Sequence, residues 1–256
     1  MKLRGPGSVR AAAQIFVSDL GAIEVEAEDA HHLSQVLRLR PGETVVACDG
    51  AGGWVTCRYR GGSERTSLIE AEGTPHHEPA PSTRVDVGFA PTKGGRPEWV
   101  TQKLTELGVD RITLVRSARA VVRWEAGRSE RVVERMRRVA RHAAAQSRRA
   151  WLPELVGVVA LSEMRALVAP VVLALAEPGA DPPTSSTTAV AVGPEGGWDA
   201  SELASGDRLV GLTAGILRAE TAAITAGVLL CSLRDGAVEA ARAHGGSSEG
   251  LEGSAK

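Results

Sequence analysis

Residues 189–203 read AVAVGPEGGWDASEL. The first four predict a buried strand, Ala189 to Val192, and a helix is expected after the glycines because Asp199 can cap it, with Glu202 at the capping-box position. Glycines at such a turn let a ligand approach the backbone, whose free N–H groups can then donate. Pro194 removes one donor and no Lys-Ser/Thr pair follows, so this is not a P-loop. The pattern alone favours a tight strand-to-helix turn over a ligand site.

Strand-like and helix-like patterns alternate on both sides of this segment, between residues 84 and 236. The expected strands are 85–90, 112–115 and 171–176, and the expected helices are 98–107, 129–147, 162–167 and 219–233. This alternation is typical of an α/β domain in which helices cover a mostly parallel sheet.

The first 73 residues have a different pattern, in which short strands are separated by Gly-rich turns and one segment, His31 to Leu39, is helical. The expected strands are 15–17, 44–48, 54–59 and 67–70. Residues 74–83, TPHHEPAPST, have three prolines and no periodicity, which indicates a linker. The predicted organisation is a β domain over 1–73, this linker, an α/β domain over 84–236 and a disordered polar tail over 237–256.

The composition is that of an ordinary globular protein, since 43% of the 256 residues are hydrophobic and 24% are charged. The longest apolar run, 168–176, has nine residues, whereas a membrane span needs about 20. No apolar h-region of a signal peptide follows the first basic residues. Three cysteines without a C-x-x-C pair indicate reduced thiols, so we expect a cytoplasmic protein.

Positive charge is concentrated between Arg111 and Arg149, where twelve Arg and three Glu give a net charge of +9, while the whole chain carries −1. The predicted inward face of the long helix is Val132, Met136, Val139 and Ala143. Beside it runs a stripe of Arg128, Arg131, Arg135 and Arg138, continued by His142. A solvated face, partly paired through Glu134 and Arg138, is the alternative. Three acids cannot neutralise twelve Arg, so we favour a surface that faces phosphates.

Two further groups of residues could carry chemistry. Arg218 and Glu220 stand at the start of the last predicted helix, where the helix dipole explains an acidic residue but not an Arg. Arg218 is therefore a candidate functional residue. The pairs His31-His32 and His76-His77 have no Cys or carboxylate at ligand spacing, so we expect surface histidines and no metal site.

Five segments together resemble one family over residues 14–234. They are HHLSQVLRLRPGE (31–43), KGGRPEWVTQKLTELGV (93–109), AAAQSRRAWLP (143–153), VGPEGGWDASEL (192–203) and GILRAETAAI (215–224). In this order they are similar to the bacterial 16S ribosomal RNA (uracil(1498)-N3)-methyltransferases of the SPOUT superfamily, and the joint occurrence of GPEGG and ILRAET is the specific signal. The chain departs from the family pattern at Ala145, where Glu is usual, and at 212–215, where L-G-x-R is usual.

The resemblance implies an α/β protein with an N-terminal PUA-like β-barrel for RNA and a C-terminal SPOUT domain containing a trefoil knot. It also implies a homodimer whose subunits complete each other's sites, and S-adenosylmethionine (SAM) held by three loops at the knot. The cofactor-binding residues would be Leu175, Ala176, Glu177, Gly193, Glu195, Gly196, Gly197, Leu212, Ile216 and Leu217. Arg218 and Glu220 would be catalytic, beside the methyl donor. RNA contacts are expected at Arg38, Arg40, Lys93, Arg96, Arg131, Arg135, Arg138, Arg148 and Arg149.

The implied reaction is direct methyl transfer to N3 of uridine 1498 in the 16S RNA of the small ribosomal subunit, without a metal. N3 must lose its proton before it attacks, and an Arg can stabilise the resulting anion. Arg218 is our candidate for that Arg, and Glu220 is a weaker candidate for the base. Two alternatives stay open: methylation of another RNA atom, such as a ribose 2′-oxygen, and RNA binding without catalysis.

Overall fold

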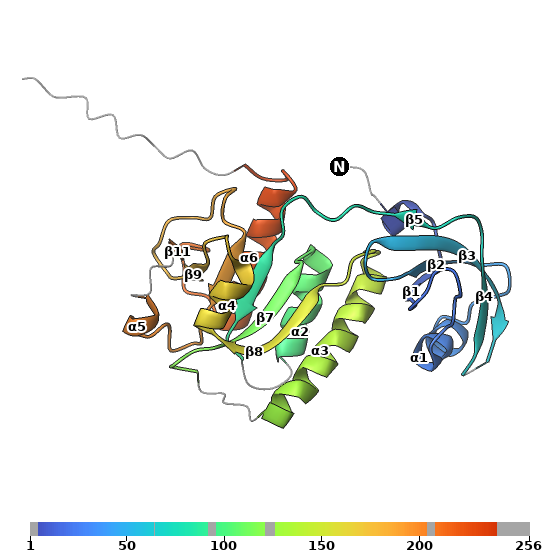
Figure 1. Ribbon diagram of the computed structural model, residues 1–256, viewed down its shortest axis with the longest axis horizontal. Coiled ribbons are helices and arrows are strands. Elements are labelled where there is room, and N and C mark those ends of the chain that lie inside the picture. The colour runs from blue at the N-terminus through green and yellow to red at the C-terminus, as the bar shows by residue number, and fades with distance from the viewer. Residues whose placement is uncertain (1–4, 64, 92–95, 121–125, 204–207, 240–256) are drawn as a thin grey trace, which may run out of the picture.

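The computed structural model forms two domains lying side by side (Figure 1). The residues that the structure describes are 5–63, 65–91, 96–120, 126–203 and 208–239. Lys93 and almost all of the tail that we expected to be disordered lie outside these ranges.

The N-terminal domain is built on one five-stranded sheet. Its strands are β1 (Ala13–Phe16), β2 (Thr44–Cys48), β3 (Gly53–Gly62) and β4 (Ser67–Ala71) in that order, with β5 (His76–His77) paired to β3. A 3-10 turn, η1 (Gly5–Ser8), precedes the sheet, and helix α1 (Ala27–His31) continues into a π-helical turn, η2 (His32–Val36). The four expected strands are confirmed. β5 lies inside the expected linker, where two His pair with Gly53 and Trp54.

The helix expected over His31 to Leu39 is only partly correct. Helical structure begins at Ala27 and ends at Val36. Leu33 is fully buried, as its spacing predicted, but Val36 is 58% exposed and Leu37 is also exposed. The apolar period therefore marks one core position of this segment rather than three.

The C-terminal domain has a six-stranded sheet in which every pairing is parallel, as expected from the alternating pattern. Its strand order is β11 (Arg208–Val210), β9 (Ala174–Ala176), β10 (Ala189–Val192), β6 (Asp86–Phe89), β7 (Arg111–Arg116) and β8 (Glu154–Ala160). The sequence did not predict the two edge strands, β8 and β11. Because all strands run in one direction, their carboxyl ends lie at one edge of the sheet.

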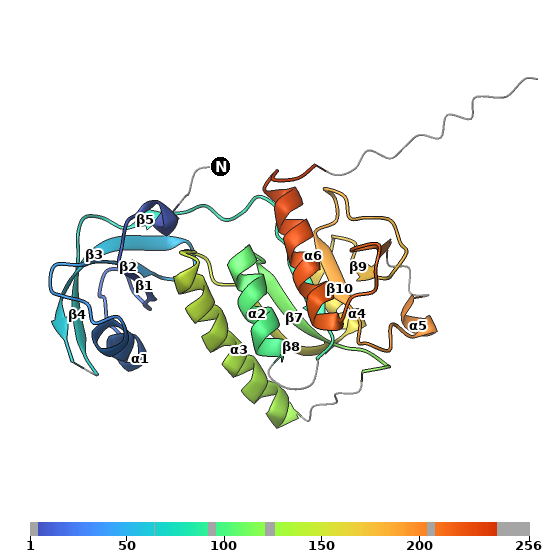
Figure 2. The same cartoon turned by 180° about the vertical axis from the view of Figure 1, so that it is seen from behind.

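Helices cover both faces of this sheet. α2 (Arg96–Leu107), α3 (Ala126–Gln146) and α6 (Ala219–Arg234) lie side by side on one face (Figure 2). α4 (Leu161–Val168) packs on the other face, and the short α5 (Ala200–Leu203) follows the β10 loop. The alternation within β10 separates the layers, since Val190 packs with α2 and α6 whereas Ala191 packs with α4. In α3 the expected inward residues Val132, Met136 and Ala143 are buried and Val139 is half-buried.

Arginine side chains of α3 and the turn after it join the two domains. Arg141 donates from Nη2 to the carbonyl oxygen of Phe16 at 2.6 Å and to the Asp29 carboxylate at 2.9 Å. Arg148 donates to the carbonyl of Ala11 at 2.7 Å. An apolar cluster that includes Phe16, Val46, Cys48 and Ala144 fills the space beneath these bonds. The domains are therefore held together by buried polar and apolar contacts as well as by the chain between them.

Two sequence expectations concern the cysteine thiols and the presence of a membrane-spanning helix. Cys48, Cys57 and Cys231 are free and buried, as expected for reduced thiols, and burial raises the pKa of the Cys57 and Cys231 thiols to about 11. Within the described ranges, no helix is both long and apolar enough to cross a membrane.

The Arg141 contacts predict a large contribution to stability. Replacing Arg141 by Met removes the donor that contacts the Phe16 carbonyl and the carboxylates of Glu26 and Asp29 in the N-terminal domain. We therefore expect a loss of about 1–3 kcal/mol in the free energy of unfolding, measured in urea. Arg137→Met is the matched control. Among the described residues, the ion-pair partner of Arg137 is the exposed Glu134 at 3.2 Å, so this change should cost less than about 0.5 kcal/mol. Equal losses in the two variants would show that the Arg141 contacts do not hold the domains together.

Candidate active site

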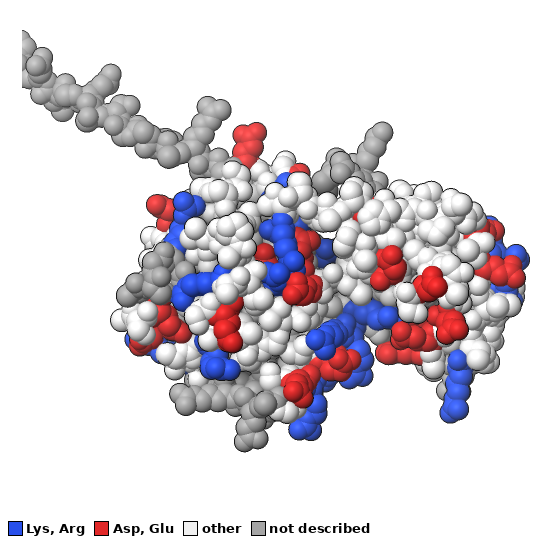
Figure 3. Space-filling view, in the orientation of Figure 1, with Lys and Arg blue, Asp and Glu red and all other residues white. Residues whose placement is uncertain are grey.

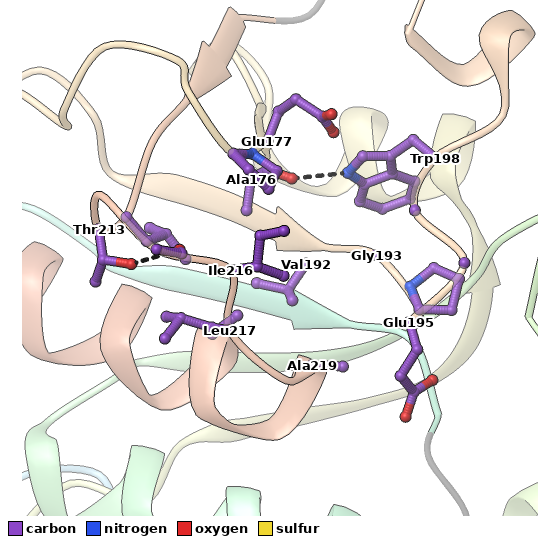
Figure 4. A pocket seen from close by; sticks show the side chains of 17 residues that line it. Ala176, Glu177, Val192, Gly193, Glu195, Trp198, Thr213, Ile216, Leu217 and Ala219 are labelled. Atoms are coloured by element: carbon purple, nitrogen blue, oxygen red, sulfur yellow. Dashed lines mark hydrogen bonds between the residues drawn. The ribbon is translucent and has the colours of Figure 1, made fainter.

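Three loops meet at the carboxyl edge of the C-terminal sheet and enclose a pocket of about 290 Å³ (Figure 4). They follow β9, β10 and β11, three strands that lie next to one another in the sheet. The pocket is lined by Ala176, Glu177, Pro178, Val192, Gly193, Pro194, Glu195, Gly196, Gly197, Trp198, Leu212, Thr213, Gly215, Ile216, Leu217, Ala219 and Ala222. The parallel sheet therefore brings together segments that are far apart in the sequence.

Nine of the ten residues expected to bind a cofactor line this pocket. The tenth, Leu175, is fully buried in the core beneath it and packs with α4. The cofactor loops that the resemblance implies, 193–197 and 212–217, also contain Pro194, Thr213 and Gly215, which line the pocket too. The residues that complete the wall from outside the predicted loops are Pro178, Val192, Trp198, Ala219 and Ala222. Most of these residues adjoin predicted ones in the same three loops, so the loops themselves were the available signal.

Trp198 closes the β10 loop onto the end of β9. Its indole is almost fully buried, and Nε1 donates to the carbonyl oxygen of Ala176 at 3.1 Å. The ring lies against Gly193, where an added Cβ would be 3.1 Å from the nearest indole atom. Gly197 has a φ of +69°, a conformation that favours glycine. The two glycines are therefore required by the shape of the loop.

The capping box expected at Asp199 and Glu202 is present. The Asp199 carboxylate accepts hydrogen bonds from the Ser201 backbone N–H at 3.0 Å and its hydroxyl at 2.7 Å, and the Glu202 carboxylate accepts from the Asp199 N–H at 2.8 Å. The Ser201 hydrogen bonds hold the pKa of Asp199 below its usual value. Glu202 also accepts from Ser117 Oγ at 3.2 Å and from the Ala118 N–H at 3.0 Å. The box thus links the β10 loop to the turn after β7.

The β11 loop contains the departure from the family pattern at 212–215. Thr213 bridges the turn through a hydrogen bond from its hydroxyl to the carbonyl of Gly215 at 2.9 Å. Leu212 and Leu217 are half-buried against the core, and Ile216 is 87% exposed at the rim of the pocket. The loop therefore contributes a largely apolar wall.

Arg218 and Glu220 flank the pocket without lining it. Arg218 is the N-cap residue of α6, with extended backbone and an exposed side chain that forms no ion pair with another described residue. Glu220 lies in the first turn of α6 and is 8% exposed. Their neighbours Leu217 and Ala219 line the pocket, so both residues lie directly beside it in the chain.

Arg131, Arg135 and Arg138 of the α3 stripe are exposed, and basic side chains follow this helix on the molecular surface (Figure 3). Arg138 is fully on the surface, Arg135 pairs with Glu98 at 3.0 Å, and Arg131 donates to the Gly127 carbonyl at 3.1 Å. Glu134 pairs with Arg137, three residues on, at 3.2 Å rather than with Arg138, and both spacings place side chains on one helix face. The stripe is thus only partly neutralised by protein groups.

The other residues expected to contact RNA lie in different environments. Arg149 donates to the carbonyl of Thr105 at 2.7 Å, and desolvation lowers its pKa. Arg148 is held in the domain interface, and desolvation lowers its pKa as well. Both guanidinium groups therefore serve protein contacts. Arg38 and Arg40 are exposed after η2, Arg96 is the first residue of α2, and Lys93 is outside the described residues.

The two histidine pairs have no metal-like geometry. His76 stacks on Trp54 with ring centroids 4.4 Å apart, and His77 meets the edge of Trp151. Of the residues that the structure describes, no group of three or more His, Cys, Asp or Glu is placed to hold a metal ion.

Comparison with known proteins identifies the family. Residues 78–230 match the model of the RNA methyltransferase domain, and residues 25–71 match that of the RNA methyltransferase PUA domain. The ribosomal RNA small subunit methyltransferase E of Mycobacterium tuberculosis is 34% identical over 229 residues, which cover 81% of this chain and 86% of that protein. The chain belongs to the ribosomal RNA small subunit methyltransferase E family.

Other members of the methyltransferase E family agree with this assignment. The Bacillus subtilis protein is 26% identical over 82% of this chain and 90% of its own length. The structure of the Neisseria gonorrhoeae protein bound to S-adenosyl methionine shares the fold, with a TM-score of 0.73 and 24% identity, and covers 86% of this chain and 97% of that one. The resemblance read from GPEGG and ILRAET is confirmed at the level of the family.

The contact between Gly193 and Trp198 predicts a difference between two glycines of one loop. Gly193→Ala brings a Cβ to 3.1 Å from the buried indole, so we expect a loss of about 1–3 kcal/mol in unfolding free energy. At Gly196 an added Cβ meets Arg119 at an ordinary 3.6 Å, so Gly196→Ala should stay within about 0.5 kcal/mol of the wild type. Urea unfolding of both variants is the measurement, and equal stabilities would contradict the described packing of Trp198.

Proposed function

We propose that this protein transfers a methyl group from SAM to N3 of uridine 1498 in the 16S RNA of the small ribosomal subunit, in the cytoplasm. The observation that carries the proposal is the pocket formed by the three loops after β9, β10 and β11, in a chain of the methyltransferase E family. Its volume of about 290 Å³ is close to the lower end of the ~300–1,000 Å³ usual for small-molecule sites.

The lining of the pocket fits SAM. Val192, Leu212 and Leu217 offer apolar contacts for the adenine ring. The glycines at 193, 196 and 197 leave backbone groups open to a ligand. The space beside the backbone of Gly197 and Gly215 is also open, since a Cβ added at either residue would meet no atom within 4 Å. Glu177 and Glu195 supply carboxylates for hydroxyl or ammonium groups. When bound, SAM supplies a methyl group that a sulfonium centre already activates.

Arg218 is the proposed catalytic residue. Its backbone is fixed between the β11 loop and α6, and its side chain is exposed beside the pocket. Uracil N3 becomes nucleophilic when it loses its proton, and the negative charge spreads onto the two carbonyl oxygens. A guanidinium beside those oxygens stabilises the anion, and so favours both deprotonation and attack. Glu220, two residues further on, is the candidate acceptor of the proton.

We propose that the active protein is a homodimer whose subunits complete each other's sites. Ile216 lies on the pocket rim with 87% of its surface exposed. An apolar side chain with such exposure beside the pocket favours coverage by a partner. A second subunit placed there would also enclose the Arg218 side chain from another side.

RNA would bind along α3 and the N-terminal domain. The arginines of the stripe, Arg131, Arg135 and Arg138, are exposed on α3, and Arg38 and Arg40 are exposed on the N-terminal domain. We leave Arg148 and Arg149 out of this surface because both side chains are half-buried and donate to backbone carbonyls within the protein. At the level of the fold, we propose that the N-terminal sheet is a PUA-like β-barrel and that the C-terminal domain is a SPOUT domain with a trefoil knot at the pocket.

Nucleoside mass spectrometry of 16S RNA from a strain that lacks this protein tests the proposed reaction. We expect 3-methyluridine to disappear and to return with the plasmid-borne gene. Loss of a ribose-methylated nucleoside would instead support a 2′-oxygen methyltransferase. An unchanged nucleoside profile would support RNA binding without catalysis.

The position of Arg218 predicts a defect in rate rather than in binding. Its contact with the anionic base forms mainly in the transition state, so Arg218→Ala should lower single-turnover methylation about 10²–10³-fold, with SAM and RNA affinities nearly unchanged. Arg218→Lys should be impaired as well, because it keeps the charge but loses the planar fork. A wild-type rate in Arg218→Ala, at wild-type stability, would make Arg218 a structural residue.

The exposed stripe predicts how RNA affinity depends on salt. Each neutralised phosphate releases condensed counterions, so replacing Arg131, Arg135 and Arg138 by Gln should reduce the slope of log affinity against log salt by about 2–3. Arg208→Gln, on the far edge strand β11, is a control that should leave the slope unchanged. If the triple variant keeps the wild-type slope, the stripe is only a solvated helix face.

A further inference from the structure

Arg119 contacts the β10 loop from outside the pocket. It lies in the turn after β7, and its Nη1 donates to the carbonyl oxygen of Gly196 at 3.2 Å. Its Nε lies 3.7 Å from Oδ2 of Asp199, in an ion pair that is half-exposed. One guanidinium therefore spans the loop from the middle of GPEGG to the cap of α5. Neither Arg119 nor these contacts were visible in the sequence motifs.

Among the residues that the structure describes, few others restrain the β10 loop at this point. Trp198 holds its end, and one internal hydrogen bond joins the Gly197 N–H to the Pro194 carbonyl at 2.9 Å. Between them, Glu195 and Gly196 are exposed and line the pocket. A two-glycine segment loses much conformational freedom when it is ordered, so an external restraint there has a large effect on the loop.

Arg119 is itself held in place. The Ala120 N–H donates to the Ser117 carbonyl at 3.1 Å, which closes a turn, and Ser117 is buried. The Glu202 carboxylate accepts from Ser117 and Ala118 in the same turn. The Cβ of Arg119 therefore lies at a fixed position opposite Gly196, where an added Cβ would be 3.6 Å away.

We propose that Arg119 is a positioning residue that holds the Gly193–Trp198 loop in the shape that accepts the cofactor. The inference rests on the proposed function, since it takes SAM as the ligand of this loop. Arg119 acts through the Gly196 carbonyl and the Asp199 carboxylate, and its planar fork reaches both groups, which are three residues apart. A single ammonium group cannot reproduce that bridge. Preorganising the loop lowers the cost of ordering it when the ligand binds.

The test compares SAM binding with the kinetics of methylation in Arg119→Ala. We expect Kd and KM for SAM to rise about five- to tenfold, with kcat at saturating SAM within about twofold of the wild type. The Kd for SAM of Arg119→Lys should lie between that of the wild type and that of Arg119→Ala. Arg116→Ala is the matched control, because Arg116 is an exposed arginine at the end of β7 that does not line the pocket, and it should keep the wild-type Kd.

A second variant cuts the same bridge from its other end. Asp199→Ser keeps a capping oxygen for α5 and removes the carboxylate that Arg119 meets. Its SAM affinity should fall less than that of Arg119→Ala, and the double variant should bind no more weakly than Arg119→Ala alone, because both changes remove one interaction. Additive losses would overturn the bridge, and this comparison holds even if one variant is less stable.

Three results would contradict the inference, and one of them also contradicts the proposed function. A wild-type Kd for SAM in Arg119→Ala would show that the loop needs no such restraint. A loss confined to the KM for RNA would make Arg119 an RNA contact instead. If the wild-type protein itself binds no SAM, the proposed function fails first and the inference fails with it.

Discussion

Parallel pairing among β11, β9 and β10 is the constraint on which the site depends. Val210 pairs with Ala176, and Leu175 pairs with Ala191, so the three strands end within a few residues of one another. A parallel strand cannot be followed directly by its neighbour, and each of the three must therefore continue into a loop that leaves the same edge. The pocket is the space between those loops. Trp198 fixes its size by tying the β10 loop to the carbonyl at the end of β9.

The same edge connects the pocket to the arginine-rich surface of α3. β7 ends there, and the turn after it carries Arg119 against the β10 loop before the chain continues to α3. α3 then presents its exposed arginines to solvent and uses Arg141 to hold the N-terminal domain. One helix therefore links the domain that the family model assigns to RNA methyltransferases with the PUA domain. Arginines close together in the sequence divide between solvent, the domain interface and the outer side of the β10 loop.

Features that depend on local sequence could be predicted from the sequence alone. The β10 strand, its glycine turn and the capping box at Asp199 all lie within fifteen residues and were predicted correctly. The edge strand β8 was missed because Gly157 interrupts its apolar run and its end continues without a break into α4. The contact of Arg119 with Gly196 joins residues 77 positions apart, which no local pattern reveals. The density of charge in the sequence likewise does not distinguish an exposed arginine, Arg138, from a desolvated one, Arg149, which lies near Asp110.

We propose that three segments distant in sequence form one SAM site at the carboxyl edge. Hydrogen–deuterium exchange of the protein with and without SAM tests this claim most directly, because backbone protection reports each segment separately. We expect SAM to slow exchange in residues 176–178, 193–198 and 212–219 together, while exchange in residues 13–71 of the N-terminal domain is unchanged. Protection in only one of the three segments, or protection centred on the N-terminal domain, would contradict it.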